Sequence, residues 1–395
     1  MSKNFEERVR FPMSLSELER RHKAVRGFME EDGIDMLIMS NDNQYLGGYI
    51  RYFTDIPAEN AYPITILFEK SGEITSISCG SPSQPGPPEW AARVITNRIS
   101  VPYFRSLNYT HRYDSDIIVD IIKNKNIGKL GLVGTGMLSW AMISAIKEST
   151  SIQTVNATPM LDKIKAVKSA EELKFVKMSV DMHQESIGFL KSTIKPGMYE
   201  YEIRSQLARW LSDYGSEEQL LLLRSEPSHV PHMIPKFYHN RQVQRGDYVT
   251  VLNESSGPGG FYCEIVRTFC LGEPSKEAVK AYDTAVELQK WVAGMLRPGV
   301  AANSIMKLYN DRLREMGMPI EDRICIHGQG YDLVEMPGFG EEDETILEEN
   351  MFIAIHPGVY LPGSKEHGTC CEDFLITPEG AVNQYTLNQE LIVID

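Results

Sequence analysis

The sequence has no long apolar run, no excess of basic residues and few cysteines. A membrane-spanning helix needs roughly 18 to 20 apolar residues in a row, so we expect no membrane partner. Lys and Arg number 40 against 54 Asp and Glu, and this balance argues against a nucleic-acid partner. Six cysteines in 395 residues do not form a disulfide framework. Because the charged start also lacks a secretion signal, we predict a cytoplasmic protein.

A chain of 395 residues exceeds what one compact core usually supports, so we expect more than one domain. The first part combines helical patterns with short apolar runs of buried-strand length, which is typical of an α/β domain. Ser16 and Glu19 are spaced as a capping box for its first helix. The predicted strands are residues 34–39, 64–68, 74–78 and 130–133. The polar segment 162–169 indicates a boundary, and we predict an α/β domain at 1–163 and a second domain at 164–395.

The second domain contains an internal repeat. A Pro-Gly pair at 196–197 recurs at 298–299, an offset of 102 residues. Each pair follows a long helical pattern, at 169–192 and 275–296, and precedes another helical pattern with strand-like segments after it. We therefore predict a duplicated α+β domain, and we expect its site in the cleft where the two copies join.

Three groups of residues carry a family resemblance. They are RGDYVTVLN and GFYCEIVRTF within 245–269, IHGQGYD at 326–332, and AIHPGVY and CCEDFLIT within 354–377. With KSAEEL at 168–173, they resemble the creatinase, prolidase and aminopeptidase P superfamily. The resemblance covers nearly the whole chain. It implies an internally duplicated pita-bread catalytic domain behind a smaller α/β domain, so the expected fold class is α/β followed by α+β.

The resemblance also points to the positions at which peptidases of the superfamily bind two metal ions through two Asp, one His and two Glu. The first two positions are 11 residues apart, and the second lies three residues before an Arg-Thr pair. The corresponding residues here are Asn253, Glu264, His327, His356 and either Cys371 or, with a slip of one residue, Glu372. Only the His position keeps the residue type that the family uses.

These replacements argue against a dinuclear site. Two divalent ions carry a charge of +4 and rely on several carboxylates, some of which bridge both ions. Asn253 and His356 are neutral where the family has carboxylates, and an imidazole cannot bridge two ions through two oxygens. We therefore expect no metal cofactor. The alternative is a single divalent ion held by Glu264, His327, His356 and Cys371, since Glu, His and Cys all suit zinc or iron.

Acid–base chemistry without metal would need histidines and carboxylates. Creatinase, a superfamily member that works without metal, has its catalytic His upstream of the Gly-Asp string. The loop at 227–240 contains His229, His232 and His239, of which the last two fit best by spacing. The predicted catalytic residues are His232, His239, His327, His356, Glu264 and Glu372. Asn253 and Cys371 are predicted to contact the substrate.

The N-terminal domain is also expected to contribute to the site. The string NQYLGGY at 43–49 resembles the family string of that place, and in creatinase-like dimers the residues just beyond it reach the partner's active site. Here these are Arg51, Tyr52 and Phe53. Arg51 would bind a substrate carboxylate, and the two aromatic rings would face a cationic group. The resemblance therefore also predicts a homodimer.

The resulting hypothesis is a creatinase-like hydrolase that cleaves a C–N bond in a small zwitterionic, amidino- or betaine-like substrate through His and Glu. Three alternatives stay open at this point. The chain is an Xaa-Pro dipeptidase or aminopeptidase with an altered metal site, a lyase of the kind that cleaves dimethylsulfoniopropionate, or a non-catalytic pita-bread binding protein.

Overall fold

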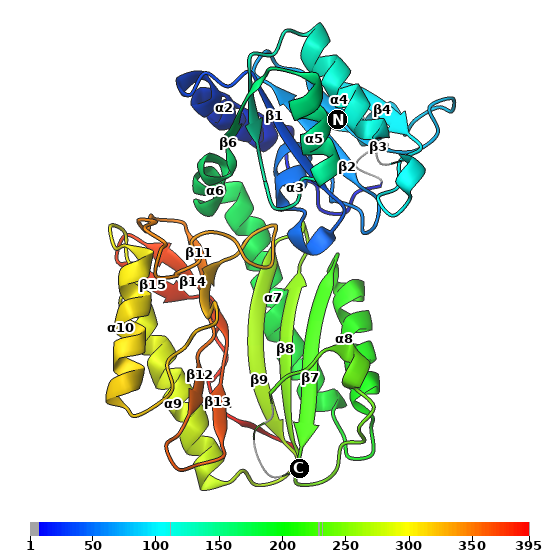
Figure 1. Cartoon of the computed structure of the whole chain (residues 1–395). Coiled ribbons are helices and arrows are strands. Elements are labelled where there is room, and N and C mark those ends of the chain that lie inside the picture. The colour runs from blue at the N-terminus through cyan, green and yellow to red at the C-terminus, as the bar shows by residue number, and fades with distance from the viewer. Residues whose placement is uncertain (1–7, 111, 228–229, 231, 395) are drawn as a thin grey trace. The chain divides into compact units, whose positions relative to one another are not determined.

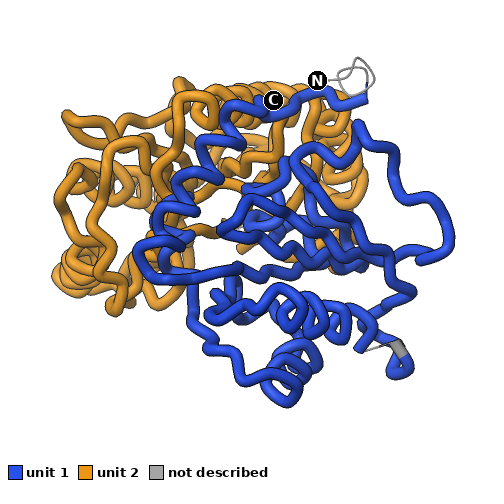
Figure 2. Tube along the Cα trace, turned by 90° about the horizontal axis from the view of Figure 1, so that it is seen from above, with its two compact units in different colours: residues 1–165 blue, residues 166–395 orange. Residues whose placement is uncertain are grey.

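The computed structural model describes residues 8–110, 112–227, 230 and 232–394. The chain divides into two compact units, Met1–Lys165 and Ala166–Asp395, which we call the N-terminal unit and the C-terminal unit (Figure 2). Among the described residues, no helix has the length and apolar character needed to cross a membrane.

The N-terminal unit is built on a six-stranded mixed sheet with the strand order β4-β3-β2-β1-β5-β6. Its strands are β1 Met36–Asn41, β2 Ile64–Glu69, β3 Ile74–Cys79, β4 Asn97–Val101, β5 Lys129–Leu132 and β6 Gln153–Asn156. Its α-helices are α2 Leu15–Glu31, α3 Gly48–Thr54, α4 Tyr113–Asn124, α5 Trp140–Ser149 and α6 Thr158–Ala166. Short 3₁₀ turns lie at Gln44–Leu46, Glu89–Ala92 and Asn108–Thr110. All six residues of β1 are buried, as the apolar run of the sequence predicts for a central strand.

The first helix begins two residues earlier than its predicted capping box. Ser14 is the N-cap of α2, and its side chain accepts a hydrogen bond from the backbone N–H of Glu17. The prediction that Ser16 and Glu19 form the box is therefore wrong in register. Ser14 and Glu17 have the same spacing, so the pattern alone does not separate the two pairs.

The C-terminal unit consists of two similar halves (Figure 1). The first half contains α7 Ala170–Thr193, α8 Glu200–Tyr214, β7 Gln219–Glu226, the 3₁₀ turn η4 Lys236–Tyr238, β8 Tyr248–Ser256 and β9 Tyr262–Cys270. The second half contains α9 Lys276–Ala293, α10 Ala302–Glu315, β10 Ile326–Gly328, β11 Phe352–Ile355, β14 Glu372–Thr377 and β15 Gly380–Asn383. The predicted duplication is confirmed, and so is the predicted capping box of Ser169 and Glu172 at the start of α7.

Each half of the C-terminal unit has a four-stranded sheet. The strand orders are β16-β9-β8-β7, where β16 is Ile392–Val393, and β10-β11-β14-β15. A two-stranded ribbon, β12 Gly358–Tyr360 with β13 His367–Thr369, extends from the second half. The sheets meet where the backbone N–H of Val266 donates to the carbonyl of Cys371 over 3.3 Å. This junction brings strands from both halves of the duplication together.

The strands around this junction have two distinct faces, because successive side chains of a strand point to opposite sides. Glu254, Glu264 and Val266 share one face of the β8–β9 pair, which we call the site face. The other face, which we call the helix face, packs against α7 in the first half and α9 in the second (Figure 1). Which face a residue occupies decides whether it can take part in a site at the junction.

Candidate metal centre

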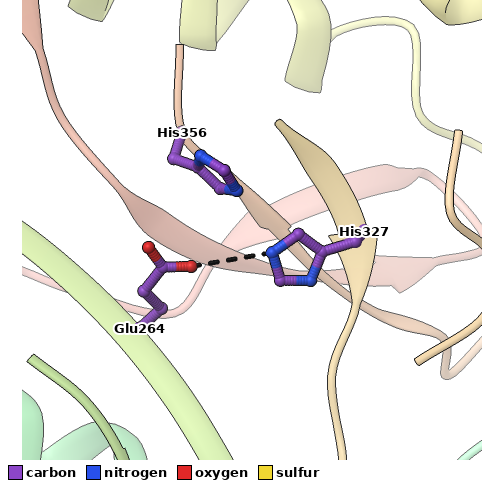
Figure 3. Close-up of side chains that lie close together, drawn as sticks. All are labelled: Glu264, His327 and His356. Carbon is purple, nitrogen blue, oxygen red and sulfur yellow. Dashed lines mark ion pairs between the residues drawn. The ribbon is translucent and has the colours of Figure 1, made fainter. Parts of the chain in front are cut away.

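Three side chains from both halves of the C-terminal unit converge near the sheet junction (Figure 3). Glu264 lies near the start of β9, His327 lies in β10, and His356 directly follows β11. Each offers one ligand atom, and these atoms all lie within 4.8 Å of one another. Nε2 of His327 is 3.7 Å from Oε2 of Glu264, and the two imidazole rings have centroids 5.2 Å apart.

The backbone sets the orientation of the His327 ring. Its Nδ1 lies 3.0 Å from the carbonyl oxygen of Gly328, a distance at which Nδ1–H donates a hydrogen bond. This hydrogen bond assigns a proton to Nδ1 and directs Nε2 toward Oε2 of Glu264. Metal-binding histidines are commonly oriented in this way by a second hydrogen bond.

The protonation states of the cluster suit a cation. Burial alone would raise the pKa of Glu264, but His356, His327 and the Cys371 thiol outweigh it and lower this pKa to about 2. Burial lowers the pKa of His356 to about 4, although Glu264 opposes this shift. Near neutral pH, Glu264 is therefore ionised and His356 is neutral, and these are the forms that bind metal ions.

A second carboxylate, which the sequence analysis did not select, faces the same space. Glu254 is directly opposite Glu264 in the register of β8 and β9. Burial raises the pKa of Glu254 well above its usual value, and the charges of Glu264 and Asp373 raise it further. The side-chain amide of Gln329 lies 3.5 Å from its Oε1. The family spacing of 11 residues selects Asn253 instead, whereas the register of the hairpin identifies Glu254.

Asn253 lies on the helix face of its strand. Its amide nitrogen donates to the hydroxyl of Ser186 on α7 over 3.2 Å, and its Oδ1 accepts from the Ser255 hydroxyl over 2.6 Å. The expectation that Asn253 contacts the substrate is therefore corrected. Because Glu254 pairs with Glu264, its chain neighbour Asn253 must point to the other side of the sheet.

Cys371 and Asp373, from the CCEDFLIT motif at 370–377, both contact Glu264. Cys371 forms a hydrogen bond with Glu264, but its sulfur lies outside the three-residue group. Burial raises the pKa of the Cys371 thiol well above its usual value, and Glu264 and Asp373 add to the shift. The Asp373 carboxylate accepts hydrogen bonds from the Glu264 backbone N–H over 3.0 Å and from the Tyr385 hydroxyl over 2.8 Å.

Glu372 points to the helix face and is not brought to the cluster. It is opposite Ile355 in the register, and its carboxylate forms an ion pair with the fully buried Arg267. Its predicted catalytic role is therefore corrected. The physical reason is the alternation of the strand, which turns Glu372 away from the side on which His327 lies.

The histidines of the 227–240 loop are not part of the three-residue group. His229 lies outside the described residues. The Nε2 of His239 is 2.7 Å from the carbonyl oxygen of Ile234 in the same loop, and the ring is buried. His232 forms a hydrogen bond with the Tyr360 hydroxyl, and its ring contacts His367 in a tilted arrangement with ring centroids 4.1 Å apart. Their predicted catalytic roles therefore gain no support from proximity to Glu264.

Arg51, Tyr52 and Phe53 are buried within the N-terminal unit. The ring of Tyr52 packs under the guanidinium of Arg21, and the ring of Phe53 contacts Phe68. Arg51 lies close enough to Asp55 to act against the rise in its pKa that burial causes. The expectation that these three side chains face a substrate is corrected, because they complete the core and the polar interior of their own unit.

Among the described residues, Glu264, His327 and His356 form the one group whose ligand atoms fit a divalent ion. A tetrahedral zinc ion with bonds of roughly 2.0–2.2 Å needs ligand atoms about 3.4 Å apart, so the group of Glu264, His327 and His356 needs only a small contraction. Two His and one Glu form a known catalytic zinc set that leaves a coordination position open. The side chains of Asn253 and Glu372 are used on the other face of the sheet, so they are not available for a second ion.

Comparison with known proteins identifies the family of the chain. The profile of metallopeptidase family M24 matches residues 174–378, which is more than half of the chain. The chain belongs to metallopeptidase family M24. Two curated relatives are named Xaa-Pro dipeptidase. The one from Pyrococcus furiosus is 26% identical over 283 residues, covering 70% of this chain and 78% of its own. The one from Pyrococcus horikoshii is 24% identical, covering 83% of this chain and 94% of its own.

Solved structures of an Xaa-Pro dipeptidase and a prolidase show the same fold. An Xaa-Pro dipeptidase from Bacillus anthracis aligns with a TM-score of 0.76 at 22% identity, covering 95% of this chain and all of the other. A prolidase from Pyrococcus horikoshii aligns with a TM-score of 0.73 at 19% identity, covering 94% and 100%. The predicted superfamily is confirmed. The predicted class, an α/β domain followed by a pita-bread domain, is confirmed as well.

Membership of the M24 family corrects the predicted reaction. The relatives of this chain are named peptidases, so the hypothesis of a creatinase-like hydrolase for amidino- or betaine-like compounds is wrong. The coarser prediction of a hydrolase is supported by the family. A metallopeptidase family also gives no support to the expectation that the site needs no metal.

Proposed function

We propose that this M24 chain is a hydrolase of short peptides, of the Xaa-Pro dipeptidase kind, with a site for one divalent ion. The convergence of Glu264, His327 and His356 carries this proposal, because it supplies three metal ligands, of which Glu264 is ionised and His356 neutral near neutral pH. The names of the relatives support a peptide substrate. The altered ligand positions distinguish this site from the dinuclear sites that the family resemblance implies.

Glu254 is the residue we assign to proton transfer. An ion bound beside it would polarise a peptide carbonyl and lower the pKa of a water molecule. Glu254 shares the site face with Glu264 but is not in the group of ligands. Burial and the nearby carboxylates of Glu264 and Asp373 raise its pKa, and a raised pKa makes a carboxylate a stronger proton acceptor. In this proposal, Glu254 takes a proton from water and passes it to the leaving amine.

The C-terminal carboxylate of a dipeptide would lie close to Gly358, two residues after His356. Nη2 of Arg323 and Nε2 of His367 lie 2.7 and 3.2 Å from the point where a Cβ on Gly358 would be. A dipeptide in an extended conformation is at most about 7 Å long, so its C-terminal carboxylate must bind within that distance of the scissile bond. Glu321 accepts hydrogen bonds from Nε and Nη2 of Arg323, and Nη1 has no partner among the described residues. We propose that Nη1 binds the substrate carboxylate.

Metal content and peptide hydrolysis, measured on the same preparation, test the proposal. The purified chain should contain about one zinc, manganese or cobalt ion and should hydrolyse members of a panel of Xaa-Pro and other dipeptides. A chelator should remove both the ion and the activity, and added metal should restore them. Glu264→Gln should bind no ion. Hydrolysis that survives complete removal of metal, or a panel in which no peptide is cleaved, would overturn the proposal.

The cytoplasmic location, the homodimer and the exclusion of nucleic acid and membrane as partners stay predictions from the sequence. We propose them together with the peptidase function. Light scattering of the purified chain would test the homodimer, since a mass near twice 44.7 kDa is expected.

A further inference from the structure

A buried polar network lies on the helix face of the strands that carry the candidate metal ligands. Its centre is the ion pair between Arg267 of β9 and Glu372 of β14, both with fully buried side chains. Arg267 also donates through Nη1 to the carbonyl of Val266 over 2.9 Å and lies 3.4 Å from that of Cys371. The pair therefore joins the two strands at the place where the two halves of the C-terminal unit meet.

The network continues from Glu372 to the strand that leads to His356. Oε2 of Glu372 accepts hydrogen bonds from Asn383 and, over 2.8 Å, from Gln389. Gln389 also donates to Oε1 of Gln289, a fully buried residue of α9. The amide nitrogen of Gln289 donates to the carbonyl of Ile355 over 2.7 Å. Ile355 is the chain neighbour of His356.

Two members of this network are close in sequence to ligands of the three-residue group. Arg267 lies three residues after Glu264, and Ile355 precedes His356. Glu264 and His356 come from different halves of the duplication, so nothing in the local chain fixes their separation. On the opposite face, the network connects their strands through side chains, in addition to the Asp373 and Cys371 contacts on the site face.

We infer that Arg267, Glu372 and Gln289 are positioning residues that hold Glu264 and His356 at the separation a single metal ion requires. Glu372 thus positions the strands that carry the ligands. The family resemblance, with a slip of one residue, would instead make it a metal ligand. Isolated buried ions are costly, and Glu372 is compensated by one guanidinium and two amide donors. This inference rests on the metal site of the proposed function.

The zinc affinity of the full chain and the absorption spectrum of its cobalt form test the inference. Glu372→Gln leaves Arg267 without its counter-ion and should weaken zinc binding about 10- to 100-fold, the usual effect of removing an outer-shell partner. Gln289→Leu changes no charge and breaks the link to Ile355, so it separates positioning from electrostatics. It should also weaken zinc binding by about 10-fold and shift the cobalt spectrum.

Two control variants make chemically similar substitutions at positions away from the junction of the two sheets. Asp247→Asn removes a buried carboxylate that pairs with Arg241 at the start of β8, and Thr284→Val alters α9 without touching Ile355. Both should leave the affinity and the spectrum unchanged even where they lower the melting temperature. Wild-type affinity in Glu372→Gln and Gln289→Leu would overturn the positioning role alone. Absence of zinc binding in the wild-type chain would overturn it together with the proposed function.

Discussion

Glu254 and Glu264 are opposite each other on the site face of β8 and β9, yet their pKa values shift in opposite directions. Both side chains are buried, so burial raises the pKa of each. Glu264 has two imidazoles beside it that reverse the shift, whereas the charged neighbours of Glu254 are carboxylates. Two identical side chains therefore suit different roles, one as an ionised ligand and one as a proton carrier.

Replacing Glu254 by Gln should separate metal binding from catalysis. The amide keeps the shape of the protonated carboxyl but cannot accept a proton from water, so we expect kcat to fall by about 10²- to 10⁴-fold. Metal content should stay at that of the wild-type chain, because Glu254 is outside the ligand group. Steady-state kinetics and elemental analysis of the same sample measure both quantities. Loss of the ion in this variant would instead make Glu254 a ligand.

Restoring the family's carboxylate at position 253 should not create a second metal site. Asn253→Asp places a carboxylate against Ser186 on the helix face and removes the amide donor from a buried hydrogen bond. We expect about 1–3 kcal/mol less stability toward unfolding, which urea denaturation would measure. The metal content should remain about one ion per chain. Two ions per chain would show that the β8–β9 register differs from the one described.

Arg323→Met should discriminate between substrates that have and lack a C-terminal carboxylate. If Nη1 binds that group, the variant should raise KM for a dipeptide by about 10-fold or more, because a hydrogen bond to a charged group contributes roughly 1.5–3 kcal/mol. The corresponding dipeptide amide has no such charge, so its KM should change little. Equal effects on both substrates would contradict the assignment of Arg323, without affecting the metal site.

The stability of the metal-free chain should decrease as the pH falls from about 6.5 to 4, in part because of His183. This buried ring accepts a hydrogen bond from the Ser255 N–H at Nε2, over 3.3 Å, and burial lowers its pKa from 6.5 to about 4. The unfolded chain binds a proton below pH 6.5 while the folded chain does not, so the stability is complete above this pH and is lost toward pH 4.

His183→Gln removes this titration. The slope of the free energy of unfolding against pH should become shallower between pH 6.5 and 4, by at most on the order of 3 kcal/mol over the range. His356 and His367, whose pKa values burial also lowers, would keep part of the slope. Chemical denaturation at several pH values, with a chelator present, gives the comparison. If the slope of the unfolding free energy against pH is unchanged in the variant, burial does not keep His183 neutral in the folded chain.

The residues of the candidate metal group could be selected from the sequence, because the family spacing depends on motifs that are short and local. Glu264, His327 and His356 each stand at a position that the resemblance marks, and the structure brings them together. The same spacing wrongly predicted that Asn253 and Glu372 lie in the site, because the position of a residue in the sequence does not show which side of the sheet it faces. The resemblance of the 43–49 string gave a separate expectation for Tyr52 and Phe53, and this also failed because their rings are buried in the core.

The sequence by itself determined the family, the duplicated domain and the residue types that depart from the peptidase pattern. These features depend on chain order, helix caps and turns, which are local properties. Only the tertiary structure decided that Glu254 faces the site and that Asn253 and Glu372 do not. A shift of one residue in strand pairing moves every side chain to the opposite face, and pairing is fixed by contacts between strands that are distant in the chain.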